Sequence, residues 1–208
     1  MHIERLILGP LQTNCYLVSS NENSPCVLII DPADEPQRLL ARIGDRKISA
    51  VLLTHGHFDH IFGAQFLCDT YGLHPQLGSS DIPTYECAEM QMQMFLHRAL
   101  PLQTPPVERG LEEGEEIHFG HQRINVINTP GHTPGGVCYY LEGAHLLLSG
   151  DSLFRYSIGR CDLPGSDGAS LVRALQEKIL ALPDETLVLP GHGDATTIAD
   201  ERMGNPYL

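Results

Sequence analysis

Residues 50–60 of the chain read AVLLTHGHFDH, so that four apolar residues run directly into a group of polar residues and glycine. The apolar part, Ala50 to Leu53, is typical of a buried β-strand. Apolar residues then recur at helical spacing from Asp59 onward, which predicts a helix that begins near this residue. The polar group therefore lies between the end of a buried strand and the start of a helix.

Four side chains in this group can bind a metal ion: His55, His57, Asp59 and His60. Imidazole nitrogens and carboxylate oxygens both coordinate Zn²⁺ at about 2.0–2.2 Å. His55 and His57 are two residues apart in an extended turn, so both rings can point at one ion. Asp59 and His60 begin the helix and face another direction, where they can hold a second ion. The stretch therefore predicts a site for two metal ions.

Three later apolar strands are each followed by Gly or Pro and one further ligand: His132, Asp151 or His192. Glycine lets the backbone turn sharply and approach an ion closely. A carboxylate can bridge two ions through its two oxygens, which makes Asp151 the natural bridge. The other histidines lack this Gly-flanked position at a strand end, and we expect them to be surface or core residues: His2, His74, His97, His118, His121 and His145.

Apolar and alternating runs predict strands over residues 3–8, 14–19, 26–30, 50–53, 122–128, 136–141, 145–149 and 186–189. Besides the helix from Asp59, the patterns predict helices over residues 35–43, 80–100 and 170–180. Two β-rich halves that each carry helices favour an α/β fold of the αββα sandwich type, with two mixed sheets face to face and helices outside. At 208 residues, we expect a single domain, residues 1–208.

The helix predicted over residues 80–100, capped by Ser80 or Asp81, carries Met90 and Met94. Methionine fits irregular gaps and adaptable surfaces. This helix is expected to pack in the core or at a dimer interface, or to form a flexible wall over a substrate site. Both a monomer and a homodimer agree with the sequence.

The charge balance argues against several kinds of partner. The chain has 13 Lys and Arg against 26 Asp and Glu, a formal net charge of −13, which repels phosphate backbones and anionic membrane surfaces. We therefore expect neither a nucleic-acid nor a membrane partner. There is no signal-peptide pattern and no apolar run of about 20 residues. With six scattered cysteines and no C-x-x-C pair, these features predict a cytoplasmic protein with reduced core thiols.

The sequence resembles the metallo-β-lactamase superfamily, whose H-x-H-x-D-H signature stands at residues 55–60 and whose later motifs stand at the three further ligands. The resemblance implies two ligand sets and a bridge between them: His55, His57 and His132; Asp59, His60 and His192; Asp151. Two divalent ions would bind there, zinc first, with iron or manganese as alternatives. Asp31 would support the metal loop from outside, for which a simple turn is the alternative.

Within that superfamily, residues 150–154 and the region of Asn205 and Pro206 resemble hydroxyacylglutathione hydrolases (glyoxalase II), in the short bacterial form without the C-terminal helical domain. The resemblance implies hydrolysis of a thioester, S-lactoylglutathione or a similar hydroxyacylglutathione, by a metal-bridging hydroxide. Asp59 would ligate the metal and orient this hydroxide as the catalytic residue. A thioester suits the site because its thiolate leaves without a strong general acid.

The candidates for substrate binding follow the bridging aspartate. Arg160 stands where glyoxalase II relatives keep a basic residue for a glutathione carboxylate, and an ion pair with Asp162 is the alternative. Arg155 and Tyr156 are expected to line the same cleft. The implied partner is therefore a small thioester, such as a glutathione conjugate.

Two other functions stay open at this point. Residues 159–162 also resemble a persulfide dioxygenase, which acts on glutathione persulfide with one iron held by two histidines and an aspartate. A non-catalytic metal-binding protein is the alternative outside enzymes, although structural zinc sites are usually closed four-ligand sites, commonly rich in cysteine. Two zinc-like ions and hydrolysis without oxygen uptake would favour the hydrolase.

Overall fold

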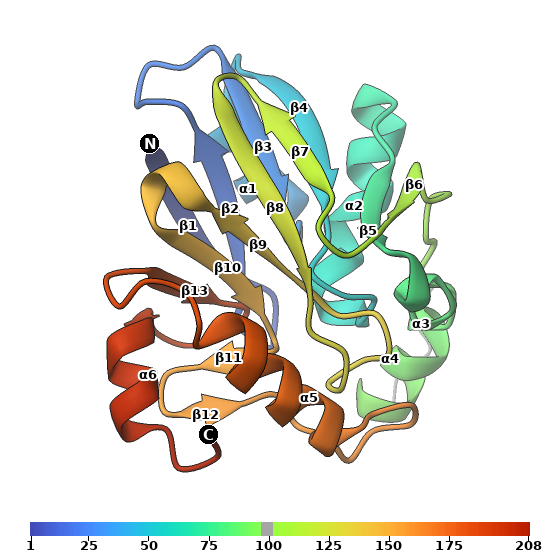
Figure 1. Ribbon diagram of the computed structural model, residues 1–208. Helices are drawn as coiled ribbons and strands as arrows, with labels where there is room; N and C mark the ends of the chain where they lie inside the picture. Colours follow the sequence, from blue (N-terminus) through green and yellow to red (C-terminus); the bar gives the residue numbers. More distant parts are fainter. Residues whose placement is uncertain (97–101) are drawn as a thin grey trace.

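The computed structural model describes residues 1–96 and 102–208, and two six-stranded sheets dominate it (Figure 1). The first sheet has the order β1 (His2–Leu8), β2 (Thr13–Ser19), β3 (Cys26–Ile30), β4 (Lys47–Leu52), β5 (Pro75–Gly78) and β6 (Arg109–Leu111). The second has the order β14 (Thr196–Thr197), β13 (Leu187–Pro190), β10 (Leu146–Gly150), β9 (Val137–Leu141), β8 (Gln122–Asn128) and β7 (Glu116–Phe119). A separate hairpin joins β11 (Leu153–Phe154) to β12 (Ser157–Ile158). Both large sheets contain parallel and antiparallel pairs, as the sequence predicts.

Helices cover the outer faces of both sheets. The helices in the described part of the chain are α1 (Pro36–Ile43), α2 (Phe58–Tyr71), α3 (Ile82–Glu86), α4 (Ala88–Leu96), α5 (Gly168–Ala174) and α6 (Ile198–Gly204). None of these has the length and apolar character needed to cross a bilayer. A π-helical turn, Leu175–Ile179, continues α5 and completes the helix predicted over residues 170–180.

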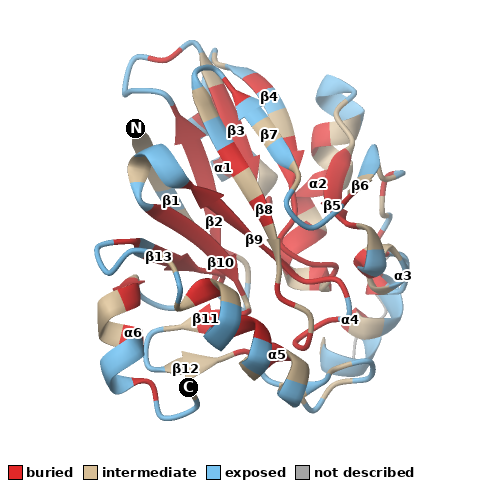
Figure 2. Cartoon of the chain, viewed as in Figure 1, coloured by how far each residue is buried: buried red, intermediate tan, exposed pale blue. Residues whose placement is uncertain are grey.

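The core lies in three layers, which confirms the αββα sandwich. Between the sheets, Leu28 of β3 packs in one cluster with Tyr139 of β9. On the outer side of the first sheet, Leu39 of α1 joins the cluster of Ile29. On the outer side of the second sheet, Leu171 of α5 packs with strand residues of β9, β10 and β13. Figure 2 shows the same layering, with β2, β9 and β10 buried and the helices partly exposed.

Strand ends bring the ligand-bearing segments to one edge of the sandwich. The parallel strands β10 and β13 place Gly150 beside Pro190, so the segments that follow them leave the sheet together. Across the two sheets, the Val137 N–H donates to the carbonyl oxygen of Thr54 at 2.8 Å. Thr13 of β2 also pairs with His192 in an isolated β-bridge. The loops of both sheets are therefore joined where the ligands lie.

The prediction of one helix over residues 80–100 is wrong for the described part of that range, and residues 97–100 lie outside the described residues. A 3₁₀ turn, Ser79–Asp81, is followed by α3, and Cys87 separates α3 from α4. Asp81 stands at the N-cap of α3, but its side chain makes no cap hydrogen bond. The carboxylate instead accepts hydrogen bonds from backbone N–H groups of two distant loops. These are tertiary contacts, which the local sequence pattern does not reveal.

The cysteines agree with the expectation that their thiols are free, but not with the expectation that all of them lie in the core. All six lie in the described part of the chain and are free. Cys15 and Cys138 are buried, but Cys87 is exposed at the break between the two helices. Cys87 is therefore not a core thiol.

Gly63 lets α2 approach the loop that follows β3, and we expect Gly63→Ala to destabilise the protein. A Cβ at this position would clash with the carbonyl oxygen of Pro32, to which the Gly63 N–H donates at 3.0 Å. Overpacking of this kind costs about 2–3 kcal/mol of unfolding free energy. Chemical denaturation measures the loss. Gly168→Ala is the control, because its new methyl would lie 3.3 Å from the Cys161 Cβ, where a shift of a few tenths of an ångström suffices. Equal stability of the two variants would contradict this account.

Candidate metal centre

All seven predicted ligands converge at the edge of the sandwich. The loop after β4 carries His55 and His57, the first turn of α2 carries the next pair, and the remaining three follow β8, β10 and β13. Their ligand atoms fall into three overlapping sets, each within 4.8 Å: His55, His57 and His132; Asp59, His60 and His192; His55, His60 and Asp151. The first two sets are those that the family resemblance implies. That they bind metal stays a prediction, because the geometry alone does not test it.

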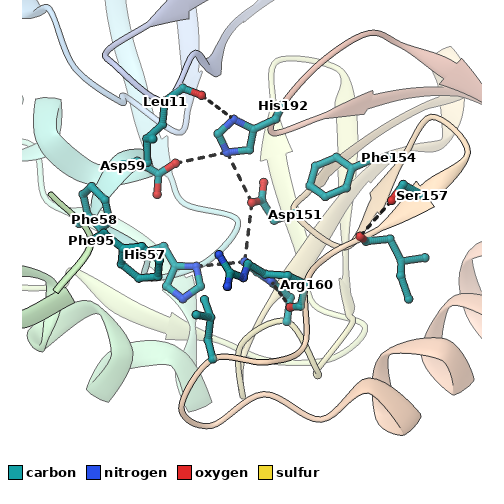
Figure 3. A pocket seen from close by; sticks show the side chains of 13 residues that line it. Leu11, His57, Phe58, Asp59, Phe95, Asp151, Phe154, Ser157, Arg160 and His192 are labelled. Carbon is teal, nitrogen blue, oxygen red and sulfur yellow. Dashed lines mark hydrogen bonds and ion pairs between the residues drawn. The ribbon is translucent and has the colours of Figure 1, made fainter. Parts of the chain in front are cut away.

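Asp151 lies between the two ligand sets. Its Oδ2 is 3.7 Å from His132 Nε2 on one side and 3.5 Å from His192 Nε2 on the other. Its Oδ1 is 3.4 Å from His60 Nε2. Figure 3 shows the carboxylates of Asp59 and Asp151 and the ring of His192 facing one another. This position suits a carboxylate that bridges two ions.

Hydrogen bonds behind the ligands orient four of the five imidazoles. In each, Nδ1 contacts an oxygen outside the centre: Thr54 Oγ1 for His55 at 3.1 Å, Asp31 Oδ2 for His60 at 2.9 Å, the Arg160 carbonyl for His132 at 2.8 Å, and the Leu11 carbonyl for His192 at 3.1 Å. Three of these oxygens belong to a carbonyl or carboxylate and accept, and the Thr54 hydroxyl donates its own proton to Asp31, so that it accepts from His55. Nδ1 therefore carries the proton in all four rings. The lone pair of Nε2 is then directed into the centre, which is the tautomer that metal binding requires.

Several buried polar atoms at the centre have no hydrogen-bond partner: His55 Nε2, His60 Nε2 and Asp151 Oδ1. Leaving a buried polar group unpaired costs about 1–3 kcal/mol. In addition, His132 Nε2 and His57 Nδ1 lie only 3.0 Å apart, both facing inward. Cations between these atoms would satisfy all of them at once. The nitrogen and oxygen donor set, without thiolate, suits zinc, iron or manganese. The residues therefore fit a dinuclear metal centre.

Charges at the centre favour a bound cation. Burial lowers the pKa of His55 well below its ordinary value and that of His57 to about 4, so both rings are neutral at pH 7. Burial acts to raise the pKa of Asp151, but the neighbouring histidines outweigh it and hold the pKa well below the ordinary value. Burial acts to lower the pKa of His60 and His192, but the neighbouring carboxylates outweigh it and raise both. The centre thus presents ionised carboxylates beside the neutral rings of His55 and His57, and a bound cation would displace the extra proton from the other two rings.

Asp31 supports the metal loop from outside, which confirms that interpretation of the sequence. Its buried carboxylate accepts hydrogen bonds from the Thr54 N–H and from Thr54 Oγ1, both at 2.8 Å, besides the contact with His60. Its backbone adopts a φ of 51°, which is uncommon for residues other than glycine. Asp31 therefore positions both the end of β4 and a ligand on α2.

Asp81 is a second positioning residue, which the sequence did not indicate. Its carboxylate accepts hydrogen bonds from the Gly56 N–H at 2.6 Å, the Gly135 N–H at 3.0 Å and Thr133 Oγ1 at 3.0 Å. It thereby ties the loop of the first two histidines to the loop of His132. Burial raises the pKa of Asp81 above its ordinary value. No local motif marks this role, because the three donors come from two distant segments.

An open cavity of about 470 Å³ borders the centre. Arg160 lines it together with five of the predicted ligands: His57, Asp59, His132, Asp151 and His192. Apolar residues that the sequence did not suggest complete much of the wall: Leu11, Phe58, Phe95, Phe154, Ile158 and Leu163. No pattern distinguishes them from core residues before the chain is folded.

The three substrate-binding candidates differ in position. Arg160 lines the cavity, and its guanidinium also pairs with Asp162 through contacts of 2.7 Å and 2.9 Å. Arg155 and Tyr156 do not line this cavity, contrary to expectation. The Tyr156 N–H donates to the carboxylate of Glu201 on α6, which holds the tip of the β11–β12 hairpin away from the centre. The Arg155 guanidinium lies over the Tyr156 ring, 5.7 Å from its centroid.

The remaining histidines in the described residues do not join the ligand sets, and none of them is buried: His2, His74, His118, His121 and His145. His97 lies outside the described residues. These positions agree with the expectation of surface residues.

A family model for the metallo-β-lactamase superfamily matches residues 8–192. The chain belongs to this superfamily. The solved structure of TTHA1623 in a di-iron-bound form is 42% identical, with a TM-score of 0.88 over 99% of this chain and 100% of that one. The BLEG-1 B3 metallo-β-lactamase structure is 34% identical, with a TM-score of 0.90 over 99% of each chain. Hydroxyacylglutathione hydrolase GloC of Haemophilus influenzae is 32% identical over 100% of this chain and 98% of its own.

Together, the superfamily match and the ligand geometry describe a metal-dependent hydrolase. The ligand sets suit two ions, and the di-iron form of TTHA1623 has two irons in a similar fold. In this superfamily member, an oxygen outside the centre holds four of the five predicted histidine ligands from behind.

We expect Asp31→Asn to weaken metal binding about 10- to 100-fold, because the contact behind a metal-ligating histidine has an effect of this size. Competition with a chelator, followed by elemental analysis, measures the affinity. Asp69→Asn is the matched control, an exposed aspartate on α2 whose side chain accepts only from Gln65 among the described contacts. A folded Asp31→Asn protein with unchanged metal affinity would refute the positioning role.

Proposed function

We propose that this protein hydrolyses thioesters, with S-lactoylglutathione or a similar hydroxyacylglutathione as substrate. The observation that carries the proposal is the pair of ligand sets joined by Asp151 beside an open cavity. The similarity to GloC supports the substrate class. Zinc is the metal that we propose first, with iron or manganese as alternatives.

The reaction adds one water to the thioester: a C–O bond forms, the C–S bond breaks, and a carboxylic acid and a thiol are released. Two divalent cations, when bound, lower the pKa of water and polarise the carbonyl oxygen. Asp59 lines the cavity, and Thr13 Oγ1 donates to its Oδ2 at 3.0 Å, which restrains the carboxylate. From this position Asp59 can accept a hydrogen bond from the attacking water and orient it.

The choice of a thioester rests on the protonation state of the two carboxylates that line the cavity, Asp59 and Asp151. Burial acts to raise the pKa of Asp59, but His60 and His192 lower it below its ordinary value, and Asp151 is likewise ionised. Neither carboxylate therefore carries a proton to donate at neutral pH. A thiol with a pKa of about 8.5 leaves readily as the thiolate, whereas an alcohol or amine leaving group needs protonation.

Arg160 supplies the basic group for a glutathione carboxylate in this proposal. Its side chain lies at the cavity, and its present partner, Asp162, is exposed, so exchange for a substrate carboxylate costs little. Its backbone carbonyl separately holds His132. Substitution of the side chain can therefore change substrate binding while this metal-loop contact stays in place.

The second ligand set favours this proposal over the one-iron persulfide dioxygenase. An enzyme that uses two histidines and an aspartate on one iron would leave several of the converging ligands without a role. Oxygen uptake with glutathione persulfide, together with one iron per chain, would contradict the hydrolase proposal and support the dioxygenase.

We expect the purified protein to release thiol from S-lactoylglutathione, and Asp59→Asn to lower kcat/KM about 100-fold or more, because the amide cannot accept a proton or hold water as the carboxylate does. A thiol-specific colour reagent follows the reaction, and metal content is measured on the same samples. Purified protein without a transition metal would refute the proposal. So would an Asp151→Ala variant that keeps both its metal and its thioesterase activity.

Arg160→Gln is expected to raise KM for S-lactoylglutathione about tenfold with little change in kcat, since a lost charge-assisted contact costs roughly 1.5 kcal/mol or more. Arg173→Gln, an exposed arginine on α5, is the control. Steady-state kinetics on both variants, with metal content in parallel, check the result. An unchanged KM for S-lactoylglutathione would show that the Arg160 side chain does not bind the substrate.

A further inference from the structure

A second cavity, of about 330 Å³, opens beside the metal centre. It shares His57, Phe95 and Leu163 with the central cavity, so the two spaces have a common wall. The chain around it comes from α3, α4, Pro134 and residues 163–165. A group attached to a substrate at the centre can therefore extend into it.

The second cavity is apolar. Its α4 side carries Met90 and Met94, exposed by 65% and 54%, and Cys87 just before the helix. Residues three and four apart share one helix face, so these side chains form a continuous stripe. No Lys, Arg, Asp or Glu is present among the described residues that line the cavity. Exposed methionines form a soft surface that adapts to apolar ligands.

α4 is held in a defined position relative to the metal centre. Gln91 Nε2 donates to the Thr84 carbonyl at 2.7 Å, and Gln91 Oε1 accepts from the Phe58 N–H at 3.2 Å. Phe58 immediately precedes Asp59, and its ring lies 5.9 Å from the ring of Phe95. The apolar stripe is therefore fixed beside the predicted ligands of α2.

One charged side chain, that of Arg160, lies beside the second cavity, and its positive charge is already paired. The Arg160 guanidinium lies over the Phe95 ring, 5.7 Å from its centroid, where the two cavities meet. Asp162 already pairs with this guanidinium. Since the second cavity offers no further cation among its described lining residues, its wall favours an apolar group over an anionic one.

We propose that this second cavity binds an apolar chain of the thioester substrate, carried by either its acyl half or its thiol half. The inference rests on the proposed thioester hydrolysis and extends it to substrates other than hydroxyacylglutathiones. Continuity with the central cavity selects a substrate group as the occupant, because the wall of one space is also the wall of the other. A second copy of the chain on the same face is the competing outcome that the tests include.

Two substrate series distinguish the halves of the thioester. One varies the acyl chain from acetyl to octanoyl on N-acetylcysteamine, and the other varies an alkyl thiol with a fixed acetyl group. We expect kcat/KM to rise roughly fourfold per methylene in one series until the cavity is filled. The double variant Met90→Ser, Met94→Ser is expected to flatten that rise. Met203→Ser, a methionine exposed by 82% on α6, is the matched control and should leave the slope unchanged.

A second readout does not depend on turnover. Cys87 lines the cavity, and its alkylation by iodoacetamide can be followed by peptide mass spectrometry with Cys26 and Cys68 as internal references. We expect the non-hydrolysable thioether S-octyl-N-acetylcysteamine to slow alkylation of Cys87 at least fivefold, and the S-methyl analogue to leave it unchanged.

The outcomes separate the two proposals. Protection of Cys87 without hydrolysis of any thioester would retain the apolar cavity and refute the proposed function. Hydrolysis without protection and with a flat chain-length series would overturn the apolar site alone. Protection that grows with protein concentration in the absence of thioether, with a dimer in sedimentation, would assign the face to a second copy and overturn the inference.

Discussion

Two buried carboxylates behind the predicted metal ligands hold the candidate centre together. Asp31 joins the end of β4 to His60 on α2, and Asp81 joins the loop of Gly56 to the loop of Gly135. Each binds donors that belong to separate segments of the chain. Together with the backbone bond between Val137 and Thr54, these contacts restrain the loops of the predicted ligands, because loops at a sheet edge are otherwise free to move.

The centre buries polar and charged groups at a cost in free energy. It collects carboxylates and imidazoles in a space where several nitrogen and oxygen atoms have no protein partner. Such a cluster is unfavourable by itself, since buried charges and unpaired polar atoms need compensation. Bound cations would supply that compensation, which would couple affinity for the ions to the stability of this edge.

Chemistry and selectivity come from different parts of the molecule. The predicted ligands follow the ends of β4, β8, β10 and β13, while the apolar wall comes from α3, α4 and the loops that face them. The rigid sheets can therefore keep the reactive geometry while the helical wall sets which substituents fit. This division agrees with a superfamily in which similar folds carry different activities.

The sequence by itself determined the seven ligand candidates, most of the longer strands and the sandwich architecture, because these depend on local periodicity and on ligand residues beside Gly and Pro at strand ends. Six short strands were missed, since their few residues carry little pattern and they form by pairing with neighbours: β5, β6, β7, β11, β12 and β14. Only the tertiary structure decided the break at Cys87, the role of Asp81, the position of Tyr156 outside the cavity and the apolar second cavity. Each of these depends on contacts between residues far apart in the chain, which leave no local signal to detect.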